Sequence, residues 1–172
     1  MDEIDSEELI GALEEIVEKF SSDIGPFAIE LAQQLTTKYK DLVSTENADG
    51  SDDEEERLMA AQSCVAAIRR IMEAICKDKN GLLQLLAVVR PIMMHCITPD
   101  GLDSIDDGLD IINIFIYHAC TRETRVPADI WTMLPQMMFI TAGNDDDVDG
   151  GFAFEHLGQV IIILQNLVNK DI

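Results

Sequence analysis

The sequence of 172 residues is poor in aromatic side chains. Aromatic residues make up only 5% of the chain, whereas the strands of a packed β-sheet are enriched in aromatic and β-branched residues. Hydrophobic residues nevertheless reach 47%, so Leu, Ile, Ala and Met must supply the core, and a disordered chain would be poorer in such residues. This composition favours packing of helix on helix.

Positive charge is scarce, since 12 Lys and Arg residues against 33 Asp and Glu residues give a formal net charge of −21. The charge is uneven, with −15 over residues 1–56, +4 over 57–97 and −10 over 98–172. A nucleic-acid-binding protein needs a positive surface to displace counterions from phosphates, so this balance argues against that function. Long acidic stretches attract basic protein partners, although solubility alone would also explain them.

Several functional signals are missing. No uninterrupted apolar run reaches the roughly 18–20 residues of a membrane span, and no secretory signal opens the chain. Cys64, Cys76, Cys96 and Cys120 lack the close spacing of a metal site, so we expect buried free thiols in an intracellular protein. The histidines have no converging partners, and no phosphate loop or nucleophile motif occurs, so we expect neither an enzyme nor a cofactor.

What the sequence has instead is a helix-start signal that recurs at intervals of about 48 residues. Acidic or capping residues open apolar-periodic runs near residues 5–6, 54–55, 102–103 and 151–152. A period of roughly 40–47 residues is typical of two-helix HEAT or armadillo units, and this spacing slightly exceeds it. Such repeats present an extended surface rather than a pocket, so the spacing favours binding of a macromolecule.

We expect one all-α domain over residues 1–172, an α-α superhelix of about three and a half helical hairpins. The hairpins are expected at about 6–45, 54–97 and 102–141, with 152–169 as half of a fourth and 46–56 as an acidic loop. The seven helices are expected at about Ser6–Ser21, Pro26–Val43, Glu54–Cys76, Leu82–Ile97, Leu102–Thr121, Pro127–Thr141 and Phe152–Asn169. The last helix is apolar nearly all round and has no following partner, which predicts a section of a longer solenoid.

One motif suggests a metal site. Asp145, Asp147, Asp149 and Gly150 match positions 1, 3, 5 and 6 of an EF-hand loop. Position 12 of that loop supplies a bidentate glutamate, and here it is His156. A solvated acidic connector is the better interpretation, and a calcium-binding helical protein is kept as a less favoured alternative.

Four stretches carry a family resemblance: DGSDDE at 49–54, IWTMLP at 130–135, IGPFAIEL at 24–31 and GGFAFE at 150–155. Together with the order of the hairpins, they resemble the importin-beta (karyopherin-beta) superfamily, in particular its importin-7/importin-8 branch of nuclear transport receptors. The resemblance runs over most of the 172 residues. It implies a fragment from the later part of a receptor built as a HEAT-repeat solenoid.

The resemblance also implies a function and partners. Receptors of this kind bind basic cargo proteins, release them when Ran-GTP binds and shuttle between cytoplasm and nucleus. The implied partners are basic protein cargo and, through the full-length receptor, the Ran GTPase and nucleoporins, with no nucleic acid and no membrane. The alternative is a helical-repeat scaffold of another large intracellular assembly, in which the acidity serves solubility.

We expect basic cargo to be held by two acidic clusters, one in the 46–56 loop and one on the fifth helix. The density of negative charge at these two places is the reason. The candidate cargo-binding residues are Asp49, Asp52, Asp53, Glu54, Glu55, Glu56, Asp103, Asp106, Asp107 and Asp110.

Overall fold

The computed structural model describes residue 15 and residues 25–44, 52–143 and 153–171. The regular structure in these residues is helical, which confirms the expected all-α fold for this part of the chain. The α-helices are α2 (Ala28–Ser44), α3 (Asp52–Ala74), α4 (Lys79–Cys96), α5 (Ile105–Ala119), α6 (Ala128–Ala142) and α7 (Leu157–Asp171), and the 3₁₀ helices are η1 (Gly25–Phe27), η2 (Pro99–Ser104) and η3 (Phe154–His156). The helix expected at Ser6–Ser21 lies outside the described residues, except for Glu15.

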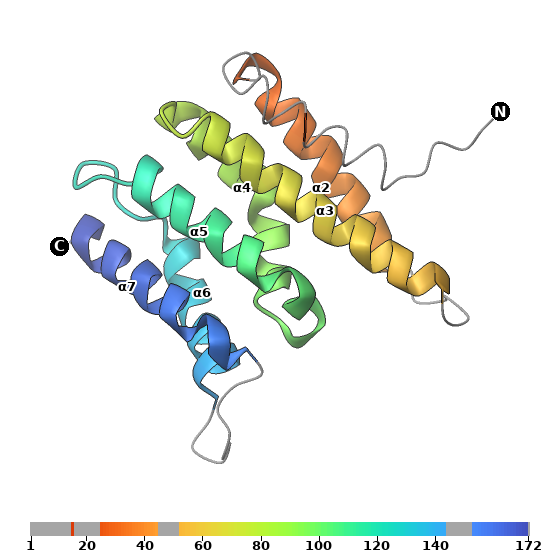
Figure 1. Cartoon of the computed structure of the whole chain (residues 1–172). Coiled ribbons are helices and arrows are strands. Elements are labelled where there is room, and N and C mark those ends of the chain that lie inside the picture. The colour runs from red at the N-terminus through yellow and green to blue at the C-terminus, as the bar shows by residue number, and fades with distance from the viewer. Residues whose placement is uncertain (1–14, 16–24, 45–51, 144–152, 172) are drawn as a thin grey trace.

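Three of the helices form a row in which all run in the same direction (Figure 1). In this row α5 lies between α3 and α7 and packs against both. Helices α4 and α6 cross behind it, with α4 packed on α5 and α6 packed on α7, while α2 packs on α3 and α4. Because α3, α5 and α7 share one direction, their N-terminal ends lie along the same edge of the molecule.

Helix α4 begins three residues earlier than the sequence predicts. The carboxylate of Asp78 accepts a hydrogen bond from the backbone N–H of Asn80 at 3.1 Å, which is the N-cap arrangement that satisfies an otherwise free amide. Lys79, Asn80 and Gly81 therefore lie in the first helical turn. The expected start of this helix at Leu82 is therefore wrong.

A tight corner joins α4 to α5. The carbonyl oxygen of His95 accepts hydrogen bonds from the backbone N–H and the hydroxyl of Thr98, at 2.9 and 2.7 Å. Gly101 lies directly against this carbonyl, since a Cβ atom built on Gly101 would be 2.1 Å from the oxygen. The segment winds as the 3₁₀ helix η2, so α5 starts at Ile105 rather than at Leu102 as predicted.

The core runs between the layers and contains the apolar faces of α3, α4 and α5. Its largest fully buried side chains include Phe115, Ile68 and Leu85. Two residues that the helical periodicity places inward, Phe27 and Leu58, are exposed. Phe27 precedes α2, and Leu58 lies near the start of α3, which is longer than the helices packed against it.

Polar contacts fix the register of α7 on α5. The Nε2 of Gln159 donates to Asp106 at 2.6 Å, and the Nδ2 of Asn166 donates to the Oδ1 of Asn113 at 2.8 Å. The Nζ of Lys170 donates to the backbone oxygen of residue 117 at 2.8 Å. All three pairs are separated by 53 residues, so the two helices lie in a single register along their length.

Candidate functional site

The first acidic cluster lies at the N-terminal end of α3. Asp52, Asp53 and Glu54 form the beginning of this helix, and Glu55 and Glu56 follow with exposed side chains. Asp49, also a candidate, lies outside the described residues. Negative side chains are favourable in a first helical turn, because the helix dipole is positive there. The expected loop over 46–56 is thus helical from Asp52 onward.

The second cluster contains two exposed and two half-buried carboxylates. Asp103 in η2 and Asp106 in α5 are exposed, whereas Asp107 and Asp110 are half-buried. The Oδ1 of Asp107 accepts a hydrogen bond from the Nε of Arg69 on α3 at 2.5 Å, and a second nitrogen of Arg69 contacts Glu73 at 2.8 Å. The charge of Asp107 is therefore largely compensated within the fold, and this bridge joins α3 to α5.

Asp110 is held in an unfavourable environment for a carboxylate. Burial raises the pKa of Asp110 above its ordinary value of 3.8, and the negative charge of Asp106 raises it further. The nearby guanidinium of Arg69 opposes this rise in the pKa. Charged Asp110 is consequently destabilising in the folded chain.

We expect Asp110→Asn to stabilise the fold at neutral pH. The folded pKa of Asp110 lies above its unfolded pKa, so stability falls as the pH rises through the interval between them. At pH 7 the amide should raise the free energy of unfolding by up to about 1 kcal/mol, since solvent screens this half-exposed group. Urea unfolding should show this gain shrinking as the pH approaches 4, and an unchanged gain would contradict the assignment. Asp103→Asn, at an exposed position, is the matched control.

The structure adds a residue to the acidic surface that the sequence reasoning did not select. Glu155 is exposed in η3, at the start of α7, and its Oε1 lies 3.9 Å from His156. The Nδ1 of His156 lies 2.8 Å from the Oε1 of Gln159, and Gln159 donates in turn to Asp106. The parallel course of α5 and α7 brings Glu155 beside the second cluster, and no short-range sequence signal reports that proximity.

These acids follow one border of the helix row. We call the exposed residues Glu55, Glu56, Asp103, Asp106 and Glu155 the acidic edge. They come from the starts of α3, of η2 and α5, and of η3, and those starts lie along the same side of the molecule (Figure 1). The edge is an open surface of carboxylates, so it can attract cations and basic side chains over a distance but cannot enclose a small substrate.

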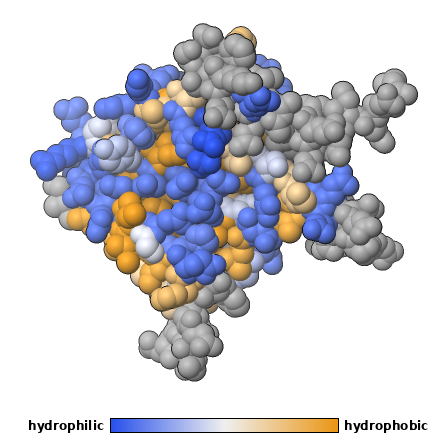
Figure 2. Space-filling model, viewed as in Figure 1, coloured by the Kyte–Doolittle hydropathy of each residue, from blue (hydrophilic) through white to orange (hydrophobic). Residues whose placement is uncertain are grey.

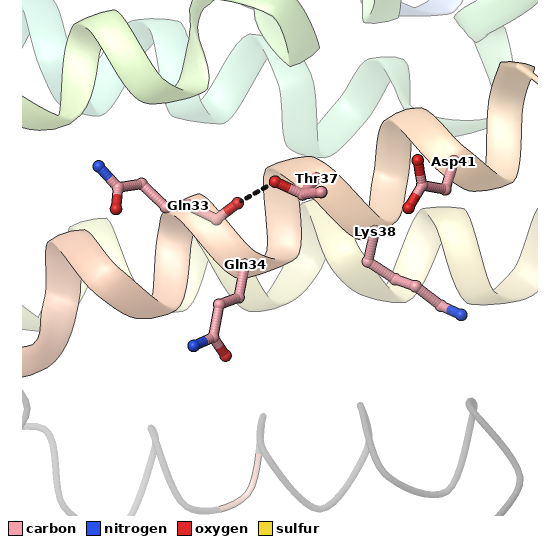
Figure 3. A pocket seen from close by; sticks show the side chains of 5 residues that line it. All are labelled: Gln33, Gln34, Thr37, Lys38 and Asp41. Carbon is pink, nitrogen blue, oxygen red and sulfur yellow. Dashed lines mark hydrogen bonds between the residues drawn. The ribbon is translucent and has the colours of Figure 1, made fainter.

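Helix α2 carries a shallow depression on its surface. It has a volume of about 360 Å³ and is lined by Gln33, Gln34, Thr37, Lys38 and Asp41. All five side chains come from one helix and point away from it without converging on a common centre (Figure 3). The hydroxyl of Thr37 is already bonded to the backbone oxygen of Gln33 at 2.9 Å. The described lining of the depression therefore lacks the converging polar groups of a ligand site.

The described residues contain no group of three His, Cys, Asp or Glu side chains placed to hold a metal ion. The EF-hand-like positions Asp145, Asp147, Asp149 and Gly150 lie outside these residues. In the same part of the chain, no single helix is long and apolar enough to span a membrane. Lys79–Cys96 and Pro99–Ala119 reach the length and apolar character of a membrane span only when they are counted together, and the two segments are bent by 116° relative to each other.

The four cysteines are thiols outside any disulfide, as predicted, but three are fully buried and Cys76, two residues beyond the end of α3, is half-buried. Burial raises the pKa of the Cys64 thiol to about 11 and that of Cys96 to about 12. These two thiols are therefore protonated at neutral pH and poorly nucleophilic. The nearby hydroxyl of Tyr39 contacts the Nδ1 of His95 at 2.7 Å and links α2 to α4. Nothing in this cluster is arranged as a nucleophile and base.

Comparison with known proteins gives two relatives. Over 170 residues, or 99% of its length, the chain is 32% identical to an importin beta-like SAD2 homolog from Arabidopsis thaliana. Over 138 residues, or 80% of its length, it is 25% identical to a probable importin-7 homolog from Dictyostelium discoideum. The chain spans 15% and 12% of the length of these relatives. No family model and no solved structure matches the chain.

The two matches confirm the resemblance to the importin-beta superfamily over nearly the whole chain. Together with the two-layered row of helices, they confirm the HEAT-repeat superhelix as its fold class.

Proposed function

We propose that this chain, related to the importin-beta superfamily, is a segment of a nuclear import receptor that binds basic proteins through the acidic edge. The observation that carries the proposal is the alignment of the exposed carboxylates of α3, α5 and η3 along one border of the helix row. The names of the two relatives support the nuclear transport role. A segment that works by surface contact requires no enzymatic activity.

The charge of the edge fits a lysine- or arginine-rich partner. Glu55, Glu56 and Asp103 all carry exposed carboxylate side chains. Exposed carboxylates attract a basic chain over roughly one Debye length, about 8 Å at physiological salt. Each such pair contributes little by itself, up to about 1 kcal/mol, so affinity requires several of them to act together.

The proposal extends to regulation and organisation. Ran-GTP is proposed to bind the longer receptor and to release basic cargo, and the receptor is proposed to shuttle between cytoplasm and nucleus.

Within the segment, α3 with α4 and α5 with α6 are proposed as repeats, and α7 as the first helix of the next. Asp107 is assigned to the bridge with Arg69 rather than to cargo.

Capture of basic nuclear proteins tests this function. The immobilised chain is incubated with purified core histones, with and without Ran loaded with a non-hydrolysable GTP analogue, and with Ran-GDP as the matched control. We expect the chain to retain histones in a salt-sensitive manner. Release by Ran-GTP alone would place Ran contacts within these 172 residues, whereas retention with Ran-GTP would assign release to other parts of a receptor. Failure to retain histones at low salt would favour the scaffold alternative.

A further inference from the structure

The border of the helix row opposite the acidic edge carries positive charge. Helices α3 and α5 run in the same direction and pack together, so their C-terminal ends lie on the same side of the molecule (Figure 1). Lys77 and Lys79 follow the end of α3, Arg122 and Arg125 follow the end of α5, and all four side chains are exposed. In Figure 2 hydrophilic residues project from this side. We call these four residues the basic edge.

The basic edge stands out against the composition of the chain. The whole sequence has 12 Lys and Arg residues against 33 Asp and Glu residues. In the segments 77–80 and 121–126 this balance is reversed, since the four cations are accompanied by two carboxylates, Asp78 and Glu123. The carboxylate of Asp78 is already used as the N-cap of α4.

Stabilisation of helix ends does not account for these cations. A cation is favourable in the last turn of a helix and unfavourable in the first turn, because of the helix dipole. Lys77 lies beyond the last residue of α3, and Lys79 begins α4, where its charge opposes the dipole. Arg122 and Arg125 lie between α5 and α6 and belong to neither helix. The positive charge therefore has no local structural reason.

Hydrogen bonds hold the backbone of both segments. The backbone N–H of Thr121 donates to the backbone oxygen of Thr124, and the N–H of Thr124 donates to the hydroxyl of Thr121, both at 3.0 Å. The N–H of Asp78 donates to the backbone oxygen of Ile75 at 2.8 Å. The cations of the basic edge are thus carried on two closed turns, so less backbone freedom is lost when a partner binds.

The acidic edge lies too far away to cancel this charge. It is at the opposite end of the same helices, and α5 has 15 residues, which corresponds to a length of about 22 Å. Charges at the surface are largely screened beyond one Debye length, about 8 Å at physiological salt. An anionic partner at the basic edge is therefore shielded from the acidic edge.

We propose that the basic edge binds an acidic segment of another protein, rich in Asp and Glu. Each guanidinium of Arg122 and Arg125 can hold a carboxylate through two parallel N–H···O bonds, and Lys77 and Lys79 add compact charges. A nucleic acid fits less well, because its continuous chain of phosphates needs a longer track of cations and the chain as a whole carries −21. The inference does not rest on the proposed function, since it uses no residue of the acidic edge.

The spacing of the helices sets the length of the partner segment. Packed helices lie about 8–10 Å apart, and an extended chain advances about 3.3 Å per residue. About three residues therefore reach from the end of α3 to the end of α5. A segment of about six acidic residues contacts the cations of both turns.

Titration of hexaglutamate into the isotope-labelled chain at physiological salt, followed by amide chemical shifts, tests the proposal. We expect saturable shifts at residues 76–80 and 120–126. The double variant Lys77→Gln/Lys79→Gln should weaken binding about fivefold or more, because two charge pairs are lost. The matched control is Lys38→Gln/Lys40→Gln, which removes two exposed lysines of the same spacing from α2 and should bind like the wild type.

A second double variant, Arg122→Gln/Arg125→Gln, should weaken binding to a similar extent, and Lys77→Arg/Lys79→Arg should retain it. The amide spectra of the free variants report whether each remains folded. Shifts that do not saturate at the two turns, or a control that weakens binding as much as the edge variants, would overturn the proposal. Tighter binding of an oligothymidylate of the same charge would also overturn it, by assigning the basic edge to phosphates.

Discussion

Gly101→Ala should destabilise the fold by about 3 kcal/mol, the upper end of the range seen when a tightly packed site is overfilled. An alanine Cβ would lie 2.1 Å from the backbone oxygen of His95 and 2.8 Å from the Cα of Cys96. These are backbone atoms, so no side-chain rotation relieves the contact. The corner between α4 and α5 must open, and both helices contribute to the core. Urea unfolding, followed by the fluorescence of the single tryptophan, Trp131, measures the loss.

Gly158→Ala is the matched control for this prediction. Gly158 lies in α7, and a Cβ built there meets no atom within 4 Å. The same substitution should therefore stabilise the chain by roughly 0.5–1 kcal/mol, because alanine loses less backbone entropy in a helix. Changes of opposite sign in the free energy of unfolding of the two variants would show that the tight corner causes the loss of stability in Gly101→Ala. A change smaller than about 0.5 kcal/mol in Gly101→Ala would show that the corner adapts without cost.

Helical periodicity predicts most of the fold because each helix buries one continuous stripe. The stripe of Val65, Ile68 and Ile71 predicts the buried face of α3, and all three residues are fully buried. Periodicity does not predict burial correctly where no neighbouring helix covers the apolar stripe. Leu58 continues the same stripe but is exposed, since α5 and α2 are shorter than α3.

The helix ends are predicted less well, because short-range hydrogen bonds compete there. The sequence Asp78-Lys79-Asn80-Gly81 is compatible both with a turn and with the N-cap of a helix. The hydrogen bond from the backbone N–H of Asn80 to the carboxylate of Asp78 identifies it as an N-cap. In the same way Thr98 and Gly101 indicate a turn. In the structure Thr98 donates a hydrogen bond to the carbonyl oxygen of His95, and the residues that follow form a 3₁₀ helix.

The candidate site could be predicted in part. Charge density along the sequence identifies both acidic clusters, but it treats all carboxylates within a cluster as equivalent. The structure distinguishes exposed Asp103 and Asp106 from Asp107, which is paired with Arg69 across 38 residues. Glu155 joins the edge through the register of α7 on α5, and long-range packing of that kind leaves no local pattern in the sequence.

Neutralising the acidic edge should abolish most of the affinity for a basic partner. The edge variant combines Glu55→Gln, Glu56→Gln, Asp103→Asn and Asp106→Asn. Each exposed pair contributes up to about 1 kcal/mol, so a loss of four charges should weaken binding of a lysine-rich peptide by about tenfold or more at low salt. Asn at position 106 keeps an oxygen that accepts the bond from Gln159, so the packing of α7 on α5 is preserved.

A control variant with the same change in net charge separates the edge from the overall charge. It combines four exposed acids of other regions: Glu15→Gln, Glu30→Gln, Asp41→Asn and Glu123→Gln. If the net charge alone attracts the peptide, both variants should weaken binding equally. If the acidic edge is the binding surface, the control should retain nearly the wild-type affinity and salt dependence.

The most direct measurement is a calorimetric titration of a lysine-rich peptide into the wild-type chain, the edge variant and the control variant at several salt concentrations. The predicted result is tight, salt-sensitive binding by the wild type and the control, with weak and nearly salt-independent binding by the edge variant. Equal affinities and equal salt slopes for the edge variant and the wild type would contradict the assignment of the acidic edge as the surface for basic proteins.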